Sequence, residues 1–218
     1  TYPVATPPES DEFNTRHLGL QWQWHANKKD TYGFTTDLGY IRLYAGSLSK
    51  EFVNFWEVPN LLMQKFPAEE FTATAKLTFT AKQDGEQADN IAKGLHPIYL
   101  IVRKASDKFI LQQAVCKDVK QQNPEQVKEL ASFPVEYLKM PGVADNEWKT
   151  VYLRVKVTKG AVCTFAYSLN GKKYTTVGDA FTARQGKWIG AKVGLFCVTP
   201  NDGNRGWADV DWFRMTNE

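Results

Sequence analysis

The segment Phe71–Thr80 reads FTATAKLTFT, and apolar and polar residues alternate along its whole length. Its apolar members stand at every second position: Phe71, Ala73, Ala75, Leu77 and Phe79. Successive side chains of a β-strand point to opposite faces of the sheet, so this period of two gathers all five on one face. The four threonines and one lysine between them would occupy the other face. The segment therefore predicts a long strand with one face in a hydrophobic core.

The same alternation recurs on both sides of this segment. It is found in the stretches Leu20–Trp24, Tyr40–Tyr44 and Val151–Val157. Turn-forming sequences separate the apolar stretches: Asp84-Gly85, Pro141-Gly142, Asn170-Gly171 and Asn201–Gly203. Asn-Gly suits a tight hairpin because both residues tolerate positive φ. Many short strands divided by such turns predict an all-β fold, a two-sheet antiparallel β-sandwich with almost no helix.

Only the stretch around Pro124 competes for helix. Asn123 offers an N-cap and Pro124 suits the first helical position, so Pro124–Ala131 is compatible with two helical turns. The same residues are compatible with the tip of a long hairpin that runs from Phe109 to Tyr137. Of the two, we expect the hairpin.

The bulk composition fits one folded domain. Of 218 residues, 43% are hydrophobic and 23% are charged, which is typical of a globular protein. The net charge of +3 comes from cations and anions interspersed along the chain, so it carries no signature of nucleic-acid binding. No stretch approaches the roughly 18 continuous apolar residues of a membrane helix. We therefore expect neither nucleic acid nor a membrane among the partners.

The opening residues differ in composition from the rest of the chain. Thr1–Ser10 reads TYPVATPPES, a polar, proline-rich stretch typical of a linker. We expect residues 1–10 to lead out of an upstream domain and residues 11–218 to form the sandwich.

The three cysteines are Cys116, Cys163 and Cys197. Their number is odd, their spacing is wide and no C-x-x-C pair occurs, which excludes zinc-ribbon and thioredoxin-like sites. Each lies in an apolar, strand-like stretch, where a free cysteine behaves as a small buried hydrophobic residue. One disulfide is sterically conceivable, but nothing in the sequence demands it. We expect all three to be reduced and buried.

The order of several short motifs resembles one protein family. The motifs are DEF at 11–13, LQWQW at 20–24, IRL at 41–43, PNLLMQKF at 59–66, FTAT at 71–74, YSLNG at 167–171, GAKVGLF at 190–196 and ADVDWF at 208–213. Together they are similar to the C-terminal concanavalin A-like β-sandwich of glycoside hydrolase family 43 β-xylosidases and α-L-arabinofuranosidases. The resemblance covers nearly the whole chain after the first ten residues, and it implies a concanavalin A-like jelly roll.

The resemblance also implies a function. In such enzymes the catalytic residues belong to a five-bladed propeller that precedes the sandwich. The chain would then be a non-catalytic accessory module that packs on the propeller, shapes the rim of its active site and binds xylan- or arabinose-containing saccharides. Two alternatives stay open: a free-standing lectin-like glycosidase or lyase, and a carbohydrate-binding or adhesion lectin domain. The compartment is open too, with a bacterial periplasmic or extracellular location favoured over the cytoplasm.

One stretch departs from the family pattern. The family has a small, glycine-containing apolar strand after the long alternating one, whereas Ala88–Pro97 reads ADNIAKGLHP. Asp89, Asn90 and Lys93 are polar where apolar residues are expected. We therefore expect this strand to be frayed or replaced by a loop.

Acidic residues near the two chain ends are the candidates for chemistry. Asp209 and Asp211 share a strand face, which suits a catalytic or calcium-binding pair, or else acids bound by backbone amides, arginines or solvent. We expect the second arrangement and no catalytic residue in this chain. Asp11 and Glu12 lie near the first strand, and with Asp211 they offer oxygen ligands for a structural calcium, the only cofactor that the sequence suggests.

The histidines are His17, His25 and His96, and their spacing matches no metal or nucleophile motif. His25 follows the strand that carries Trp22 and Trp24, so it is placed to donate to a sugar hydroxyl. We expect Trp22 to face the core. Trp24 stands nearer the strand end and remains a candidate for contact.

The strongest candidate for a contact surface begins on the strand around Arg42. Tyr40, Arg42 and Tyr44 alternate with two aliphatic residues that suit the core, so they are expected on the outer face. The loop Gly46–Val58 follows, and among its polar residues it carries three aromatic ones: Phe52, Phe55 and Trp56. Such residues stack on pyranose rings or anchor protein interfaces. We expect one continuous surface that contacts a sugar or, as the resemblance favours, the neighbouring propeller.

Overall fold

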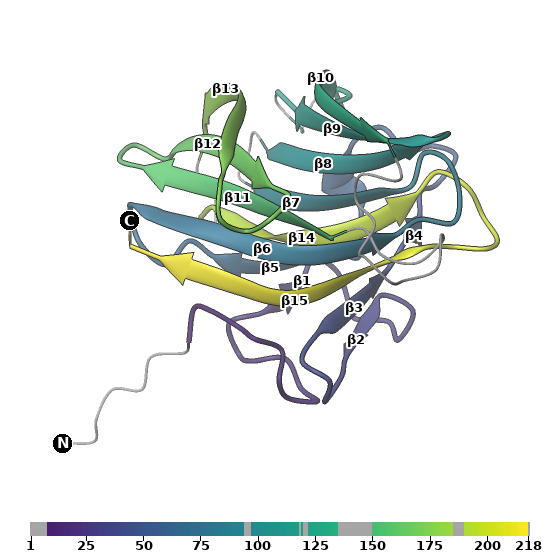
Figure 1. Ribbon diagram of the computed structural model, residues 1–218, viewed down its shortest axis with the longest axis horizontal. Coiled ribbons are helices and arrows are strands. Elements are labelled where there is room, and N and C mark those ends of the chain that lie inside the picture. Colours follow the sequence, from purple (N-terminus) through teal and green to yellow (C-terminus); the bar gives the residue numbers. More distant parts are fainter. Residues whose placement is uncertain are drawn as a thin grey trace.

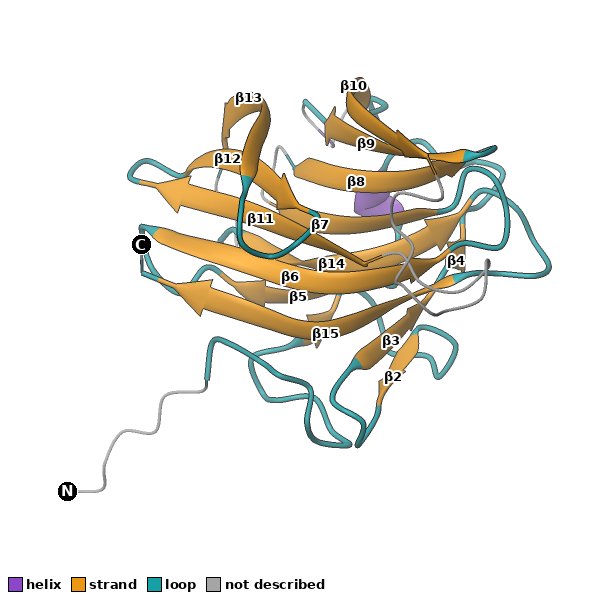
Figure 2. Cartoon of the chain, viewed as in Figure 1, coloured by secondary structure: helices purple, strands orange, loops and turns teal. Residues whose placement is uncertain are grey.

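The computed structural model describes residues 8–93, 97–117, 119, 122–134, 150–184 and 190–217. Its strands form two sheets packed face to face, which confirms the predicted sandwich (Figures 1 and 2). The front sheet, nearer the viewer, has the order β13 (Thr175–Thr182), β12 (Val162–Ser168), β11 (Thr150–Thr158), β6 (Phe71–Thr80), β15 (Trp207–Thr216), β3 (Ile41–Tyr44) and β2 (Gly33–Thr35). The back sheet has the order β1 (Gln23–Trp24), β5 (Leu62–Lys65), β14 (Lys192–Thr199), β7 (Gln87–Lys93), β8 (Ile98–Ala105), β9 (Lys108–Val115) and β10 (Gln126–Pro134).

Two short elements join this frame. Strand β4 (Gly46–Ser47) pairs in parallel with β14, whereas the other strand pairs of the described residues are antiparallel. A 3-10 turn, η1 (Phe55–Glu57), follows it. In its described part the chain forms no helix long and apolar enough to span a bilayer.

Strand β6 lies at the centre of the front sheet, and its apolar residues face the back sheet as predicted. All five are at most 1% exposed: Phe71, Ala73, Ala75, Leu77 and Phe79. Its threonines are buried as well, because longer side chains of neighbouring strands cover them. The Arg154 Nε donates to Thr74 Oγ1 at 2.9 Å, and the hydroxyls of Thr78 and Thr150 share a hydrogen bond of 2.9 Å. The central strand therefore has two covered faces.

The segment around Pro124 belongs to a hairpin, as we expected. Strand β10 pairs antiparallel with β9 from Gln126, opposite Val115, to Pro134, opposite Lys108. Since β9 would otherwise be an unpaired edge, this pairing satisfies backbone groups that two isolated helical turns would leave open. Tyr137 and the predicted turn at Pro141-Gly142 lie outside the described residues.

The turn at Asn170-Gly171 joins β12 to β13, but it is wider than the tight hairpin that we predicted. Strand β12 ends at Ser168 and β13 begins at Thr175. Gly171 has φ of 71°, and the Asn170 Oδ1 accepts hydrogen bonds from the backbone N–H groups of Lys172 and Lys173, at 2.9 and 3.0 Å. These bonds stabilise a longer loop, so the Asn-Gly pair does not form the two-residue turn.

For Ala88–Lys93 the expectation was wrong, because β7 is a regular strand with a partner on each side, β14 and β8; residues 94–96 lie outside the described residues. Its polar residues are buried within it. Asn90 points into the core between the sheets, where its Nδ2 donates to the Leu153 carbonyl at 3.2 Å. Lys93 points to the other face, and its amine contacts an aromatic ring and an imidazole. Asn90 and Lys93 therefore have polar partners from distant segments where the family pattern led us to expect apolar packing.

A second hydrophobic cluster covers the outer face of the back sheet. It combines residues of that face with three from the loop between β4 and β5, Phe55, Val58 and Leu61; the others are Met63, Ile91, Tyr99, Ile101, Ala114, Phe196 and Val198. The loop is fastened at η1, where the Phe55 N–H donates to Glu125 Oε1 at 2.6 Å and the Asn54 Nδ2 donates to the Asn123 carbonyl at 2.9 Å. The loop Gly46–Val58 is therefore a packed cover of the back sheet.

None of the three cysteines forms a disulfide, and each is 0% exposed, as we expected. Burial raises the pKa of Cys163 to about 11, and it raises the pKa of Cys197 as well. Thiolate is the reactive form, so we expect the native chain to react with Ellman's reagent only slowly, and all three thiols to react at once in denaturant. Rapid labelling of any of them in the native chain, followed by mass spectrometry, would contradict this burial.

Candidate functional site

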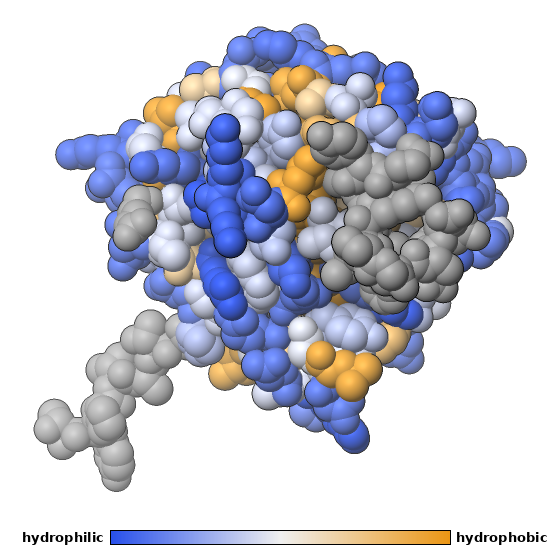
Figure 3. Space-filling view, viewed as in Figure 1, coloured by the Kyte–Doolittle hydropathy of each residue, from blue (hydrophilic) through white to orange (hydrophobic). Residues whose placement is uncertain are grey.

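An ion pair lies on the outer face of the front sheet, where three of the predicted contact residues are found: Tyr40, Arg42 and Tyr44. Arg42 on β3 and Asp209 on β15 are cross-strand partners, and the guanidinium donates to both carboxylate oxygens at 2.7 and 2.8 Å. The same guanidinium lies 4.7 Å from the centroid of the Trp207 ring and 5.7 Å from that of Tyr40. Figure 3 looks onto this sheet and shows a face on which hydrophilic residues predominate. Arg42 is therefore committed to a structural pair, whose partner is 3% exposed.

The other candidate acids are also engaged by donors. Asp211 forms an ion pair with Lys76, and Glu12 accepts two hydrogen bonds from Arg214 at 2.7 and 2.9 Å. The Asp11 carboxylate accepts from the Trp22 indole N–H at 2.8 Å. The first and last segments do lie side by side, through a bridge between residues 11 and 213. A calcium ion bound to these acids would have to displace cations, and the described residues contain no group of three metal-ligating side chains.

The structure divides the predicted contact surface into two parts. Tyr40, Arg42 and Tyr44 face outward from the front sheet, and Tyr44 packs 5.9 Å from Phe34. After Ala45 the chain crosses to the back sheet, where β4 pairs with β14. The loop that follows therefore covers the opposite layer of the sandwich. The continuity that we expected is wrong, because a strand and the loop after it need not belong to the same sheet.

The three aromatic residues of the loop lie in different environments. Phe55 is 5% exposed, and its ring packs 5.1 Å from Tyr99 and 5.2 Å from Phe196. Phe52 is half-buried against Phe55, at 5.3 Å. Trp56 is also half-buried, but its ring lies against the amine of Lys93. Phe55 thus anchors the loop inside the domain, which corrects its expected role in contact, while Trp56 and Phe52 keep an open side.

Trp56, His25 and Lys93 form a compact group at the edge of the second cluster, which we call the Trp56 group. The Lys93 amine lies 4.4 Å from the centroid of the Trp56 ring and 3.3 Å from both ring nitrogens of His25. The His25 Nε2 is 2.9 Å from the Trp56 carbonyl oxygen. A carbonyl only accepts, so Nε2 carries the proton and Nδ1 is free to accept from the lysine. The group brings together two predicted contact residues, His25 and Trp56.

Burial controls the charges of this group. Lys93 is 4% exposed, and burial together with the nearby charge of Lys192 lowers its pKa to about 7. Burial and the charges of Lys93 and Lys192 lower the pKa of His25 to about 4. Near pH 7, His25 is therefore neutral, whereas Lys93 is present in both its protonated and its neutral form.

We expect the substitution Lys93→Met to stabilise the chain more at pH 7 than at pH 10. The pKa of Lys93 is about 7 in the folded chain and near 10.4 in the unfolded one, so between these values the unfolded state binds more protons and stability rises with pH. Methionine removes that dependence while keeping most of the volume. The gain in unfolding free energy should be about 3 kcal/mol larger at pH 7 than at pH 10, measured by urea denaturation.

Lys82→Met is the matched control, because Lys82 is exposed and also lies over a tryptophan ring, 5.2 Å from that of Trp207. It should change stability equally at the two pH values. Equal effects of Lys93→Met at both values would show that the folded chain does not hold Lys93 with a lowered pKa.

Trp24, His17 and their neighbours lie at one open edge of the sandwich. Trp24 packs on the core and on Tyr32, at 5.6 Å, and with Trp22 it lines a cleft of about 330 Å³. Phe34 and the polar side chains of Arg16 and His17 complete its walls. Trp24 therefore remains available for contact, but on a different edge from Trp56. His96 lies outside the described residues.

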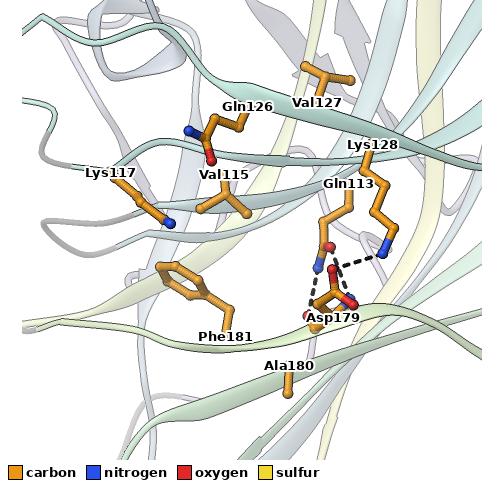
Figure 4. A pocket seen from close by; sticks show the side chains of 9 residues that line it. All are labelled: Gln113, Val115, Lys117, Gln126, Val127, Lys128, Asp179, Ala180 and Phe181. Atoms are coloured by element: carbon orange, nitrogen blue, oxygen red, sulfur yellow. Dashed lines mark hydrogen bonds and ion pairs between the residues drawn. The ribbon is translucent and has the colours of Figure 1, made fainter.

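A second cleft, of about 370 Å³, opens at the other edge, between the last strands of the two sheets (Figure 4). Lys117, Val115 and Phe181 gather on one side of it in Figure 4. On the other side, Gln113 of β9 bridges the sheets: its Nε2 donates to the Asp179 carbonyl at 2.8 Å and its Oε1 accepts from the Asp179 N–H at 3.0 Å. This cleft offers an aromatic ring, an ammonium and amide groups together.

Sequence reasoning missed this second cleft and the part that Lys93 plays. The cleft forms where β10 and β13 end their sheets, and no sequence signal marks two strands as edges. Lys93 was read as a misplaced polar residue in a strand. A lysine directly after Ile91-Ala92 in a strand-like stretch was the available signal, because a buried lysine needs a special partner.

The sequence matches the family model described as the beta xylosidase C-terminal concanavalin A-like domain, over residues 10–216. A beta-xylosidase of Formosa agariphila is 26% identical over 233 residues, and the match takes in 97% of this chain and 36% of that protein. The crystal structure of the GH43 BlXynB protein from Bacillus licheniformis shares 22% identity with a TM-score of 0.73, covering 99% of this chain and 41% of that one. The chain thus spans little more than a third of the first and about two fifths of the second.

The sandwich also resembles a solved chain of similar length, from work on endo-acting O-glycanases of the human gut microbiota. That match has a TM-score of 0.57 at 11% identity and covers 97% of this chain and 99% of the other. At this identity the likeness shows the fold alone.

Proposed function

Because this chain belongs to the family of beta-xylosidase C-terminal concanavalin A-like domains, we propose that it is the non-catalytic accessory module of a family 43 glycoside hydrolase. The parent enzyme would be of the β-xylosidase or α-L-arabinofuranosidase type. The module packs on an upstream catalytic five-bladed propeller, shapes the rim of its active site and binds xylan- or arabinose-containing saccharides.

The match over residues 10–216 carries this proposal, because it takes in both sheets and both clefts. The engagement of the acids supports the non-catalytic part. A glycosidase needs one carboxyl group to protonate the leaving oxygen and another to act as base or nucleophile. Here Asp209 is paired with Arg42 and Asp211 with Lys76. Either carboxylate would have to break its ion pair before it could act on a substrate.

The cleft of Figure 4 is the candidate for the saccharide. Its volume, about 370 Å³, lies within the range of small-molecule sites. The C–H face of a pyranose stacks on an aromatic ring, which Phe181 offers, and Lys117 and Gln126 can hydrogen-bond the ring hydroxyls. The ion pair between Lys128 and Asp179, at 2.9 Å, holds the far wall in place.

Titration calorimetry of this chain with xylo-oligosaccharides and arabino-oligosaccharides tests the saccharide part. We expect weak binding that Phe181→Ala reduces at least tenfold, the loss of one stacking contact of about 1.4 kcal/mol. Phe34→Ala is the matched control, because Phe34 is a partly exposed ring, 43% exposed, at the other edge. Unchanged binding by Phe181→Ala would show that the saccharide does not bind in this cleft.

An aryl-xyloside assay separates the accessory module from a free-standing enzyme. We expect the chain alone to be inactive and the parent enzyme to be active. Hydrolysis by the chain alone, abolished by Asp211→Asn, would overturn the accessory role in favour of a lectin-like glycosidase. Saccharide binding by a chain that has no enzyme upstream would favour the lectin alternative.

A further inference from the structure

Three lysines stand directly opposite one another on adjacent strands of the back sheet. Lys192 of β14 has Lys65 of β5 as its cross-strand partner on one side and Lys93 of β7 on the other. Directly opposite residues point to the same face, and strands are about 4.8 Å apart, so the outer two members of this lysine row are roughly 10 Å apart along the backbone. All three lie on the outer face of the back sheet, and Lys93 also belongs to the Trp56 group.

Without a partner of opposite charge, such a row destabilises the sheet. Like charges directly opposite each other on neighbouring strands destabilise a sheet. The lysines that form ion pairs in the described part of the chain are Lys76, Lys104 and Lys128, and no member of the row is among them. The amine of Lys192 donates to Gln23 Oε1 at 3.0 Å, and that of Lys93 meets His25 and Trp56. These partners are neutral, so the positive charge of the row is not balanced.

The pKa values reflect the same repulsion. Burial, followed by the charge of Lys192, lowers the pKa of Lys93, and burial followed by the charge of Lys65 lowers the pKa of Lys192. Two lysines whose ammonium forms are disfavoured therefore stand side by side on this face. An anion from outside the chain that bound here would offset the repulsion between the ammonium groups.

The chain also enters the domain beside this row. The Gln64 side chain, one residue before Lys65, donates to the Glu9 carbonyl at 3.0 Å. Gln64 is directly opposite Val193 of the core, so residue 9 meets β5 on the inner face, one position along the strand from Lys65. A domain joined upstream of residue 8 would be tethered within a few residues of Lys65, at high effective concentration.

We propose that the lysine row of Lys65, Lys192 and Lys93, with Trp56 beside it, binds carboxylate side chains of the upstream catalytic domain. This inference rests on the proposed function and names the surface through which the module packs on its enzyme. The carboxylates contact the amines of Lys65 and Lys192, while Lys93 is itself buried and adds its charge from within the sheet face. The open edge of the Trp56 ring packs against the partner. Arg and aromatic residues commonly anchor interfaces, and paired charges set their register.

Zero-length cross-linking of the full-length enzyme with a carbodiimide tests this surface without any substitution. The reagent joins an amine to a carboxylate only where the two are in contact. We expect amide cross-links from Lys65 or Lys192 to aspartate or glutamate residues that precede residue 8. Lys156 is the internal control, because it is exposed on the outer face of the front sheet. Cross-links from Lys156 to the upstream domain, with none from the row, would overturn the inference.

Charge reversal measures the contribution of the row. We expect the double variant Lys65→Glu/Lys192→Glu to bind a separately produced catalytic domain at least tenfold more weakly than the wild-type chain, and Lys156→Glu to bind within twofold. The melting temperature of the free variant shows that it is folded. Unchanged binding by the double variant would overturn this inference alone. If the wild-type chain neither binds the catalytic domain nor cross-links to it, the packing role under the proposed function fails as well.

Discussion

Replacing Arg42 with methionine is expected to lower the unfolding free energy by about 3 kcal/mol, because it leaves a buried carboxylate without its cation. The Asp209 side chain is 4% exposed and the Arg42 side chain 21%, so water cannot replace the two charge-assisted hydrogen bonds. The guanidinium also stacks against Trp207 and Tyr40, and methionine retains only part of that contact. Urea denaturation of the chain at pH 7 measures the loss.

A double-mutant cycle separates the charge from the packing. Asp209→Asn removes the buried charge, so the double variant Arg42→Met/Asp209→Asn should be less destabilised than the sum of the two single variants. The neighbouring pair of Lys76 and Asp211 is the matched control, because its side chains are 30% and 34% exposed. Lys76→Met should cost no more than about 1 kcal/mol. Similar losses at the two pairs would show that the first pair is no more buried than the second.

The fold could be predicted because the decisive strands are long and strictly alternating. In Phe71–Thr80 and Val151–Val157 the side-chain period alone fixes which face is buried, and both strands take the predicted orientation. Where the pattern was broken by polar residues, as in β7, the prediction failed. Partners such as Leu153 and His25 come from segments more than 60 residues away, and local sequence does not show them.

The candidate site could be predicted only in part, for a related reason. Sequence reasoning selected Trp56 and His25 separately, from an aromatic loop and from the end of a strand. Their meeting over Lys93 depends on the pairing of β14 with β7, and on the crossing of the chain between sheets after Ala45. The lysine row has the same origin, since its members stand at positions 65, 93 and 192 and only the strand order brings them together.

The substitutions Phe55→Ala and Trp56→Ala should differ in their effects on stability and on enzyme activity, although the two residues are neighbours. Phe55 is 5% exposed and contacts Tyr99, Phe196 and Phe52, so its truncation leaves a cavity in the second cluster. We expect a loss of about 3 kcal/mol in unfolding free energy for Phe55→Ala. Trp56 is half-buried, and its ring lies over an amine rather than inside the cluster, so Trp56→Ala should cost about 1 kcal/mol or less.

In the parent enzyme, we expect Trp56→Ala to lower activity although it has the smaller effect on stability. Trp56→Ala removes a surface ring beside the lysine row while η1 stays fastened through Asn54 and Glu125. Substrate affinity or turnover of the full-length enzyme should therefore fall even though the module stays folded. Phe55→Ala releases the loop, so activity should fall together with stability and recover on cooling. If Trp56→Ala left both the enzyme kinetics and the binding of the separate catalytic domain unchanged, Trp56 would have no contact role, and the loop would serve only to cover the back sheet.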